Sequence, residues 1–363
     1  MKFSICIPNY NYARYIGETI ESVRRQQAEI EILVSDNCST DDSVAVVEAF
    51  DDPRIKLHVN RGNVGFAGNL DRACQDATGD RMLLLSSDDL ARPDAFGTYA
   101  ALAEALGPAA DRAIFSSGYE VIDGDGIKTG EAGLDRRLWP EAERDEALSA
   151  AVGAPVYRHD AARLLQRSLE LVRTPFSFAS TCYPRGLYEQ LEGYGGGYMF
   201  NPDKMFAWKL MSAADQAFFV DRPLFAYRVH ANNQAALQRE AGALKHLMDQ
   251  YRATFDTAPE VLERAGFSRE DMARAFVEQD IGLRGLKMVA EGERTLARRG
   301  VDFGKAAYPA VAGHCGKVRI LRALLALGPL GTMVARPFYR RAMASYEAQG
   351  AANDTPGTAA GAP

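Results

Sequence analysis

Residues 83–90 read LLLSSDDL, and this stretch decides how we expect the N-terminal part of the chain to fold. Its leucines form a short apolar run, which is typical of a strand buried on both faces of a parallel sheet. Directly after the run, Asp88 and Asp89 stand next to each other. Adjacent carboxylates repel each other unless a cation or hydrogen-bond donors compensate their charge. The stretch predicts a cation site at the end of a buried strand or, alternatively, an aspartate that caps the helix around Pro93.

The segments around this strand alternate strand and helix patterns. Apolar runs typical of strands cover residues 2–7, 29–35, 54–59 and 81–85. Helical spacing or capping residues mark residues 15–26, 43–50 and 65–77. Strands separated by helices of this length pair in parallel through right-handed crossovers. We therefore predict an α/β fold with a doubly wound, mostly parallel sheet and flanking helices.

Each of the four predicted strands ends in a polar loop. The loops read PNYN (residues 8–11), SDNCSTDD (35–42), NRGNVGFAGN (60–69) and SSDD (86–89). Ligands of such sheets bind beyond the carboxyl ends of the strands, so we expect the four loops to form one site. The third loop is neither G-x-G-x-x-G nor a lysine-ended P-loop, which disfavours a dinucleotide oxidoreductase and a P-loop hydrolase.

The composition limits the class of protein further. With 47% hydrophobic and 25% charged residues, the 363-residue chain has the composition of an ordinary globular protein. Its net charge of −6 disfavours nucleic-acid binding. Five scattered cysteines without C-x-x-C spacing suit the reducing cytosol rather than a disulfide framework or a zinc site. We see neither a secretory signal nor an apolar window of about 18 residues that could span a bilayer.

Three downstream positions also have the chemistry of a site. Asp203 lies near the start of a helix that Asn201 and Pro202 are expected to open, where it is either a general base or a charge that complements the helix dipole. Arg228 and His230 are two residues apart and share one side of a strand, so they could clamp a diphosphate or complete a metal site.

The four loops together identify a family that the chain resembles. SICIPNYN (4–11), EILVSDNCSTDDS (31–43), NVGFAGNLDRA (63–73) and LLLSSDD (83–89), in this order and spacing, resemble the inverting family 2 glycosyltransferases with a GT-A fold. The resemblance is strong over residues 1–125 and weaker to about residue 234. No Q-x-x-R-W sequence of the processive synthases is present, which favours transfer of a single sugar.

The resemblance implies a role for each matching residue. Asp203 would be the catalytic base, and Asp89 and His230 would form the site of a divalent cation, Mn or Mg. The nucleotide-sugar site would be formed by Pro8, Asn9, Tyr10, Asp36, Asn63, Asn69, Asp88 and Arg228. From the residues alone, Asp36 either contacts the nucleotide or forms a turn. Many relatives have an acidic residue where this chain has Ser86 and Ser87, so we expect weak metal binding until the donor arrives.

Four regions follow from this assignment. Residues 1–125 would be the nucleotide-sugar-binding half of the GT-A domain and 126–235 the half that binds acceptor and supplies the base. Residues 236–345 would form a helical C-terminal extension, and 346–363 a disordered tail. Within the extension, the apolar segment 317–341 has arginines at its flanks, so it either packs on the domain or lies at a membrane interface. We favour the membrane interface.

The implied activity is metal-dependent, inverting transfer of one sugar from a nucleoside-diphosphate sugar, with UDP as the expected nucleotide. The acceptor would be a hydroxyl of a glycan or of a lipid-linked molecule in cell-surface polysaccharide assembly, and the enzyme would be cytoplasmic, at the inner face of the membrane. Two alternatives stay open. A nucleotidylyltransferase would need a glycine-rich basic signature, which PNYNYARY (8–15) lacks. A non-catalytic relative is kept open by Ser86.

Overall fold

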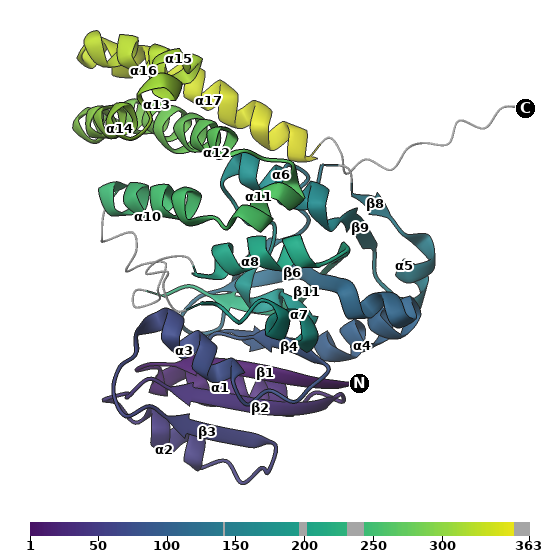
Figure 1. Cartoon of the computed structure of the whole chain (residues 1–363). Helices are drawn as coiled ribbons and strands as arrows, with labels where there is room; N and C mark the ends of the chain where they lie inside the picture. Colours follow the sequence, from purple (N-terminus) through teal and green to yellow (C-terminus); the bar gives the residue numbers. More distant parts are fainter. Residues whose placement is uncertain (141, 196–201, 231–242, 352–363) are drawn as a thin grey trace, which may run out of the picture.

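The structure is a computed structural model of the chain, shown in Figure 1. It describes all residues except 141, 196–201, 231–242 and 352–363, and only the backbone of 243, 244, 338 and 342–351. A mixed sheet runs through the molecule, helices cover both of its faces, and a group of helices at the C-terminal end lies to one side (Figure 1).

The N-terminal half of the sheet is parallel, as the sequence predicts. Its strands follow the order β3-β2-β1-β4, and every neighbouring pair in this half is parallel. The strands are β1 (Lys2–Asn9), β2 (Glu29–Asp36), β3 (Ile55–Val59) and β4 (Arg81–Leu84). The connecting helices are α1 (Ala13–Arg24), α2 (Ser43–Glu48) and α3 (Gly65–Cys74). The carboxyl ends of β1, β2 and β4 therefore meet at one edge.

The second half of the sheet continues the order as β10-β6-β11-β9-β8. The two longest strands, β6 (Ala113–Ile122) and β11 (Gln216–Arg228), pair in parallel. Short strands add antiparallel pairs: β5 (Leu90–Ala91), β7 (Lys128–Ala132), β8 (Glu143–Arg144), β9 (Val156–Asp160) and β10 (Cys182–Pro184). The predicted fold class is confirmed, with antiparallel pairs that the sequence did not indicate.

Two downstream segments differ from what their sequences predict: FSFASTCY (176–183) reads as one strand, and FFVDRPLFAYRV (218–229) reads as two short strands around Pro223. Residues 176–183, expected to be a strand, form the 3₁₀ turn η2 (Phe178–Ser180) followed by β10. Residues 218–229, expected to be two strands around Pro223, lie mostly in the continuous strand β11, whose register against β6 shifts on both sides of Pro223. An irregular register admits a proline because no ladder hydrogen bond is required of its nitrogen.

Helices on the two faces bury two separate apolar cores, which is the doubly wound arrangement. One core includes side chains of α3, α6 (Ala161–Leu171) and α8 (Pro202–Ala213). The other includes side chains of α1, α2, α4 (Ala95–Leu106) and α5 (Glu146–Val152). The 3₁₀ helix η1 (Gly107–Arg112) and the helix α7 (Arg185–Gln190) complete this part.

The predicted helical extension has a core of its own, formed by side chains such as Phe276, Val289 and Leu321. Its helices are α10 (Ala243–Asp256), α11 (Pro259–Ala265), α12 (Arg269–Phe276), the π-helix η3 (Val277–Leu283), α13 (Arg284–Glu291), α14 (Arg294–Ala307), α15 (Pro309–His314), α16 (Gly316–Ala326) and α17 (Pro329–Ala351). α11 and α12 pack against α8 and α6. Among the described residues, no helix has both the length and the apolar character that crossing a bilayer requires.

The first residues of the region predicted to be a disordered tail, 346–351, belong to α17. Their sequence, YEAQGA, contains alanine, glutamate and glutamine, which favour helix. Residues 352–363 of this region lie outside the described part of the chain.

Arg81 joins the two halves of the sheet. Its side chain is buried at the start of β4, and its guanidinium lies 3.7 Å from the centre of the Phe115 ring. It donates hydrogen bonds to the carbonyl oxygens of Ala110 (2.9 Å), Ala113 (2.7 Å) and Cys182 (3.2 Å). One buried cation thereby satisfies three carbonyl groups from η1, β6 and β10.

We expect Arg81→Met to lower the free energy of unfolding by about 3 kcal/mol, because it leaves buried carbonyl groups without donors. Urea unfolding followed by circular dichroism measures the change. The matched control is Arg25→Met, whose side chain is 76% exposed and forms an ion pair with Glu21. A loss no greater than that of the control would contradict a structural role for Arg81.

Candidate active site

A cleft with about 1660 Å³ of empty space, part of it open to solvent, lies at the carboxyl ends of β1, β2 and β4. Eight of the residues singled out from the sequence line it: Pro8, Asn9, Tyr10, Asn63, Asn69, Asp88, Asp89 and Asp203. The other three do not line it, and they are Asp36, Arg228 and His230. Residues that the sequence did not single out also line the cleft, among them Tyr12, Asn37, Phe66, Tyr119, Phe178 and Tyr227.

Asp36 is turned into the protein. Its side chain is buried at the end of β2, and Oδ1 accepts a hydrogen bond from Asn9 Nδ2 at 2.7 Å. Ser39 donates its hydroxyl to Oδ1 at 2.6 Å and its backbone N–H to Oδ2 at 2.8 Å. This arrangement is the turn-forming alternative, and a contact between Asp36 and a nucleobase stays a prediction.

Asparagine amides hold the first three loops together. Asn69 Nδ2 donates to the carbonyl oxygens of Asn9 (3.2 Å) and Ser35 (3.1 Å), and Asn69 Oδ1 accepts from Asn60 Nδ2 (3.0 Å). Asn37 Nδ2 donates to Asn63 Oδ1 at 3.0 Å. The loops are thus positioned by one another, because Asn69 joins the third loop to the first two and Asn37 joins the second loop to the third. Sequence analysis missed Asn37 and Asn60, although both lie in the polar loops that it identified.

Asp88 and Asp89 are both buried, with Asp89 only 1% exposed. The backbone N–H of Arg228 donates to Asp89 Oδ1 at 2.9 Å, and His230 Nε2 lies 3.0 Å from Asp88 Oδ2. Burial raises the pKa of Asp89 well above its usual range, and the charge of Asp88 raises it further. Burial also raises the pKa of Asp88, against the lowering effect of His230. The pair is therefore held in an environment that disfavours its double negative charge.

Arg228 is buried behind these carboxylates. Its Nε donates to the backbone oxygen of Asp88 at 2.8 Å, and its Nη2 pairs with Glu18 Oε2 at 2.6 Å. Its guanidinium lies 5.0 Å from the centre of the Tyr15 ring. Because these contacts anchor the side chain outside the cleft, the structure makes Arg228 a support of the Asp88–Asp89 loop.

His230 is oriented by two tyrosines and by Asp88. The ring centres of Tyr15 and Tyr12 lie 4.7 Å and 5.8 Å from that of His230. Burial and the two nearby aspartates raise the pKa of Tyr12, which keeps its phenol neutral. Its Nε2 atom faces the Asp88 carboxylate, and a contact of His230 with a metal ion stays a prediction.

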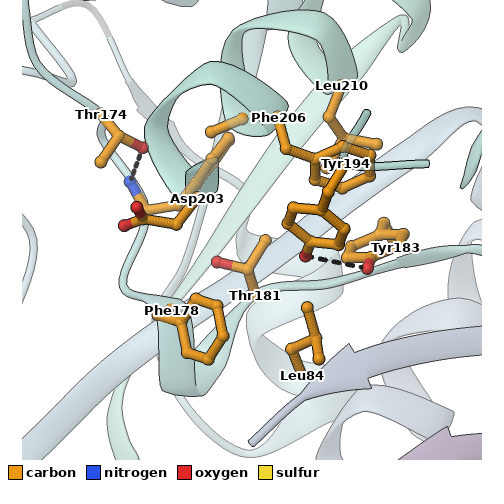
Figure 2. A pocket seen from close by; sticks show the side chains of 11 residues that line it. Leu84, Thr174, Phe178, Thr181, Tyr183, Tyr194, Asp203, Phe206 and Leu210 are labelled. Carbon is orange, nitrogen blue, oxygen red and sulfur yellow. Dashed lines mark hydrogen bonds between the residues drawn. The ribbon is translucent and has the colours of Figure 1, made fainter. Parts of the chain in front are cut away.

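Asp203 lies in the first turn of α8 and is half-buried. It lines both the cleft and a smaller adjoining pocket, and five of the eleven residues that line this pocket are aromatic. Figure 2 shows Asp203 and Phe178 on one side of this pocket and the hydroxyls of Tyr183 and Tyr194, 3.3 Å apart, on the other. Burial raises the pKa of Asp203, against the lowering effect of the backbone N–H and the charge of Lys204. A raised pKa makes this carboxylate a stronger base.

Lys204, the next residue, was not anticipated. It is 5% exposed, and its Nζ donates a hydrogen bond to Gln250 Oε1 of α10. Burial lowers the pKa of Lys204 to about 8. The contact fastens the first turn of α8, which positions Asp203, to the C-terminal extension.

The chemistry of the carboxylate pair fits a hard divalent cation, because carboxylate oxygens are the ligands that Mg²⁺ and Mn²⁺ prefer. Asp89 and Asp88 would hold it. Within the described part of the chain, no group of three or more candidate side chains is arranged around a common metal position. Any ion bound there would need further ligands from a substrate or from water.

Residues 4–131 match the sequence profile of the family described as glycosyl transferase family 2. Two curated relatives match shorter segments. The poly(ribitol-phosphate) beta-N-acetylglucosaminyltransferase TarS of Staphylococcus aureus is 35% identical over 96 residues. The Escherichia coli UDP-Glc:alpha-D-GlcNAc-diphosphoundecaprenol beta-1,3-glucosyltransferase WfgD is 40% identical over 88 residues. Each segment covers 24% of this chain, but only 16% of TarS and 35% of WfgD.

Solved structures show the same fold over nearly the whole chain. TarS residues 1–349 in complex with UDP-GlcNAc superpose with a TM-score of 0.60 at 18% identity, covering 94% of this chain and 92% of that chain. The mannosyltransferase PcManGT from Pyrobaculum calidifontis, in complex with GDP-Man and Mn²⁺, superposes with a TM-score of 0.50 at 18% identity, covering 97% and 86%. The GT-A fold is confirmed.

We expect Asp89→Asn to raise the melting temperature of the ligand-free protein at neutral pH by a few degrees. The pKa of Asp89 is higher in the folded state than the unfolded value of about 3.9, so between these two pKa values the folded state binds more protons than the unfolded state. The stability of the folded state therefore falls as pH rises from about 3.9 towards the folded-state pKa. The asparagine removes the charge and keeps an oxygen that can accept the hydrogen bond from the backbone N–H of Arg228.

Differential scanning calorimetry from acid to neutral pH measures this effect as the difference between variant and parent. The gain should grow with pH above about 4. Asp76→Asn, a surface aspartate paired with Arg72 on α3, is the matched control and should leave the melting temperature unchanged. A stability loss in Asp89→Asn at neutral pH would show that the carboxylate is favourably compensated.

Proposed function

From the membership of residues 4–131 in glycosyltransferase family 2, we propose that the protein is an inverting glycosyltransferase. It moves one sugar from a nucleoside-diphosphate sugar to a hydroxyl of a glycan or lipid-linked acceptor. The observation that carries the proposal is the convergence of Asp203 with Asp88 and Asp89 on one cleft, although Asp203 lies more than a hundred residues farther along the chain.

The donor is proposed to lie along the polar loops, with its nucleotide against Pro8, Asn9 and Tyr10 and near Asn63 and Asn69. These residues line the cleft, and the asparagine contacts preorganise the loops. The diphosphate would then reach the carboxylate pair. A metal ion bound by Asp89 and Asp88 would supply positive charge where the leaving diphosphate becomes more negative.

Asp203 is the proposed base. Its carboxylate takes the proton of the acceptor hydroxyl as that oxygen attacks the anomeric carbon. The new carbon–oxygen bond forms on the face opposite the diphosphate, whose bond to the same carbon breaks, and the electron pair leaves with the nucleoside diphosphate. Attack from the opposite face inverts the anomeric centre, so an α-linked donor gives a β-linked product.

The proposed substrate classes follow the relatives. TarS has been solved with UDP-GlcNAc, and WfgD is described as using UDP-Glc and a diphosphoundecaprenol-linked acceptor. We therefore assign a UDP-sugar donor and a glycan or lipid-linked acceptor of cell-surface polysaccharide assembly, with the protein in the cytoplasm at the inner face of the membrane. Phe178, which lines the cleft together with Asp203, would contact the acceptor, because aromatic rings pack against the apolar faces of sugars.

The first test measures the hydrolysis of UDP-glucose and UDP-N-acetylglucosamine. We expect Asp203→Asn to reduce kcat by about 10²–10⁴-fold, the usual contribution of a general base. Binding of UDP, measured by calorimetry, should not change, because Asp203 is proposed to act on the acceptor. The acid limb of kcat should lie above the ordinary aspartate pKa of about 3.9, since the base must be ionised.

Asp215→Asn is the control for this test. Asp215 lies just beyond the other end of α8, where its exposed side chain pairs with Arg112. If Asp203→Asn turns over donor as fast as this control, Asp203 is not the base.

The second test concerns the metal. We expect Mn²⁺ titrated into the protein alone to bind weakly, and UDP to tighten its binding by tenfold or more, because the diphosphate adds ligands that the protein lacks. Isothermal calorimetry with and without UDP measures the difference. Asp89→Ala should abolish the gain. Equally tight metal binding in the absence of UDP would contradict this assignment.

A further inference from the structure

The C-terminal extension contains a long segment with charges of a single sign. Residues 303–346 include seven lysines and arginines and neither aspartate nor glutamate, in a chain whose net charge is −6. Two of these cations are engaged within the protein: Lys317 pairs with Glu278, and Arg336 donates to the carbonyl oxygen of Ala290. The side chains of Arg319, Arg322, Arg340 and Arg341 are exposed.

Large apolar side chains are exposed on α16 and α17, the two helices that contain these four arginines. On α17, Leu330 and Met333 are 63% and 68% exposed, and Val334 follows on the same face because positions i, i+3 and i+4 coincide on a helix. On α16, Ile320 and Leu327 are exposed as well. Leu327 and Leu330 lie on either side of the turn at Gly328, so the two faces adjoin at this turn.

These exposed residues are not the edge of the core. The opposite faces of the same helices bury Val318, Leu321 and Leu325 of α16 and Ala335 of α17 in the core of the extension. Each helix thus has one apolar face inside and a second one outside. Figure 1 places both helices at the end of the molecule opposite β2 and β3.

We propose that the outer faces of α16 and α17, with Ile320, Leu327, Leu330 and Met333 at their centre, dock on an anionic lipid surface. The apolar side chains enter the boundary between headgroups and acyl chains, and the exposed arginines contact lipid phosphates. Both helices would lie in the plane of the surface, as amphipathic interfacial helices do. The inference goes beyond the proposed function and does not depend on it.

The charge of the surface decides between lipid and a second copy of the chain. A two-fold dimer through this face would bring the same patch of both copies together. Arg319 and Arg322 would then face a partner surface built from the same segment, which contains no acidic residue between positions 303 and 346. Anionic lipid, in contrast, supplies the opposite charge.

Co-sedimentation of the full chain with vesicles tests the proposal without any substrate. We expect binding to vesicles that contain phosphatidylglycerol, release at high salt, and weak binding to pure phosphatidylcholine. Leu330→Ser should weaken binding about tenfold through the loss of one inserted apolar side chain. Arg319→Gln with Arg322→Gln should weaken it about tenfold or more, and only on the anionic vesicles.

Ile127→Ser is the matched control, because Ile127 is 64% exposed in the turn between β6 and β7 and should leave binding unchanged. Parent, variants and control should share one melting temperature, since all these positions are exposed. Absence of vesicle binding by the parent, or equal binding by Leu330→Ser and the parent, would overturn the proposal. A dimer seen by light scattering and lost in Leu330→Ser would assign the surface to a second copy. Donor hydrolysis is measured separately, so a failure of the lipid-docking proposal can be distinguished from a failure of the proposed enzyme activity.

Discussion

Two carboxylates buried next to each other need hydrogen-bond donors and cations around them, and much of the structure is arranged to supply these groups. Asp88 and Asp89 lie in the connection that follows the fourth strand, and the groups that hold them come from far along the chain. Arg228, 139 residues after Asp89, supplies its backbone N–H, and its side chain reaches Asp88 and Glu18. The carboxylate pair therefore requires that α1, the β4–β5 connection and the end of β11 meet at one place. The contacts of Asp88 and Asp89 with Arg228 thus join the two halves of the sheet at the cleft. Arg81 joins the two halves at the other end of β4.

The same cleft contains carboxyl groups whose charged forms are disfavoured in the ligand-free protein. Burial raises the pKa values of Asp89 and Asp203, and in both cases the charged form is disfavoured in the absence of ligand. Buried carboxylates without a compensating cation are typical of functional sites, because a substrate or an ion that it brings can supply the compensating charge. The non-catalytic alternative does not explain why a third carboxylate, the half-buried Asp203, lines the same cleft with a raised pKa. The convergence of the three therefore favours an enzyme over a binding module.

Sequence reasoning predicted the cleft better than its surroundings, for a physical reason. Parallel strands bring their carboxyl ends to one edge, so four polar loops could be placed without knowledge of their contacts. Asp203 could not be placed in this way, because no periodicity joins it to the sheet. Its place at a helix start left two roles open, and only the resemblance assigned it to the site. The three-residue strand β10 is too short to show alternation. Contacts such as Lys204 with Gln250 depend on two helices that meet only in the folded chain.

The C-terminal extension connects the proposed chemistry with the proposed surface. Lys204 and Gln250 fasten the helix of Asp203 to α10, and α11 packs against that same helix. α16 and α17 belong to the apolar core that also includes Leu247 of α10. The residues that would contact lipid and the base that would deprotonate the acceptor are thus parts of one packed helical body rather than ends of a flexible linker. Docking of the outer faces of α16 and α17 would consequently fix the orientation of the cleft relative to the bilayer. For a lipid-linked acceptor, such an orientation restricts which hydroxyl can reach Asp203, so the fold itself would contribute to acceptor selection.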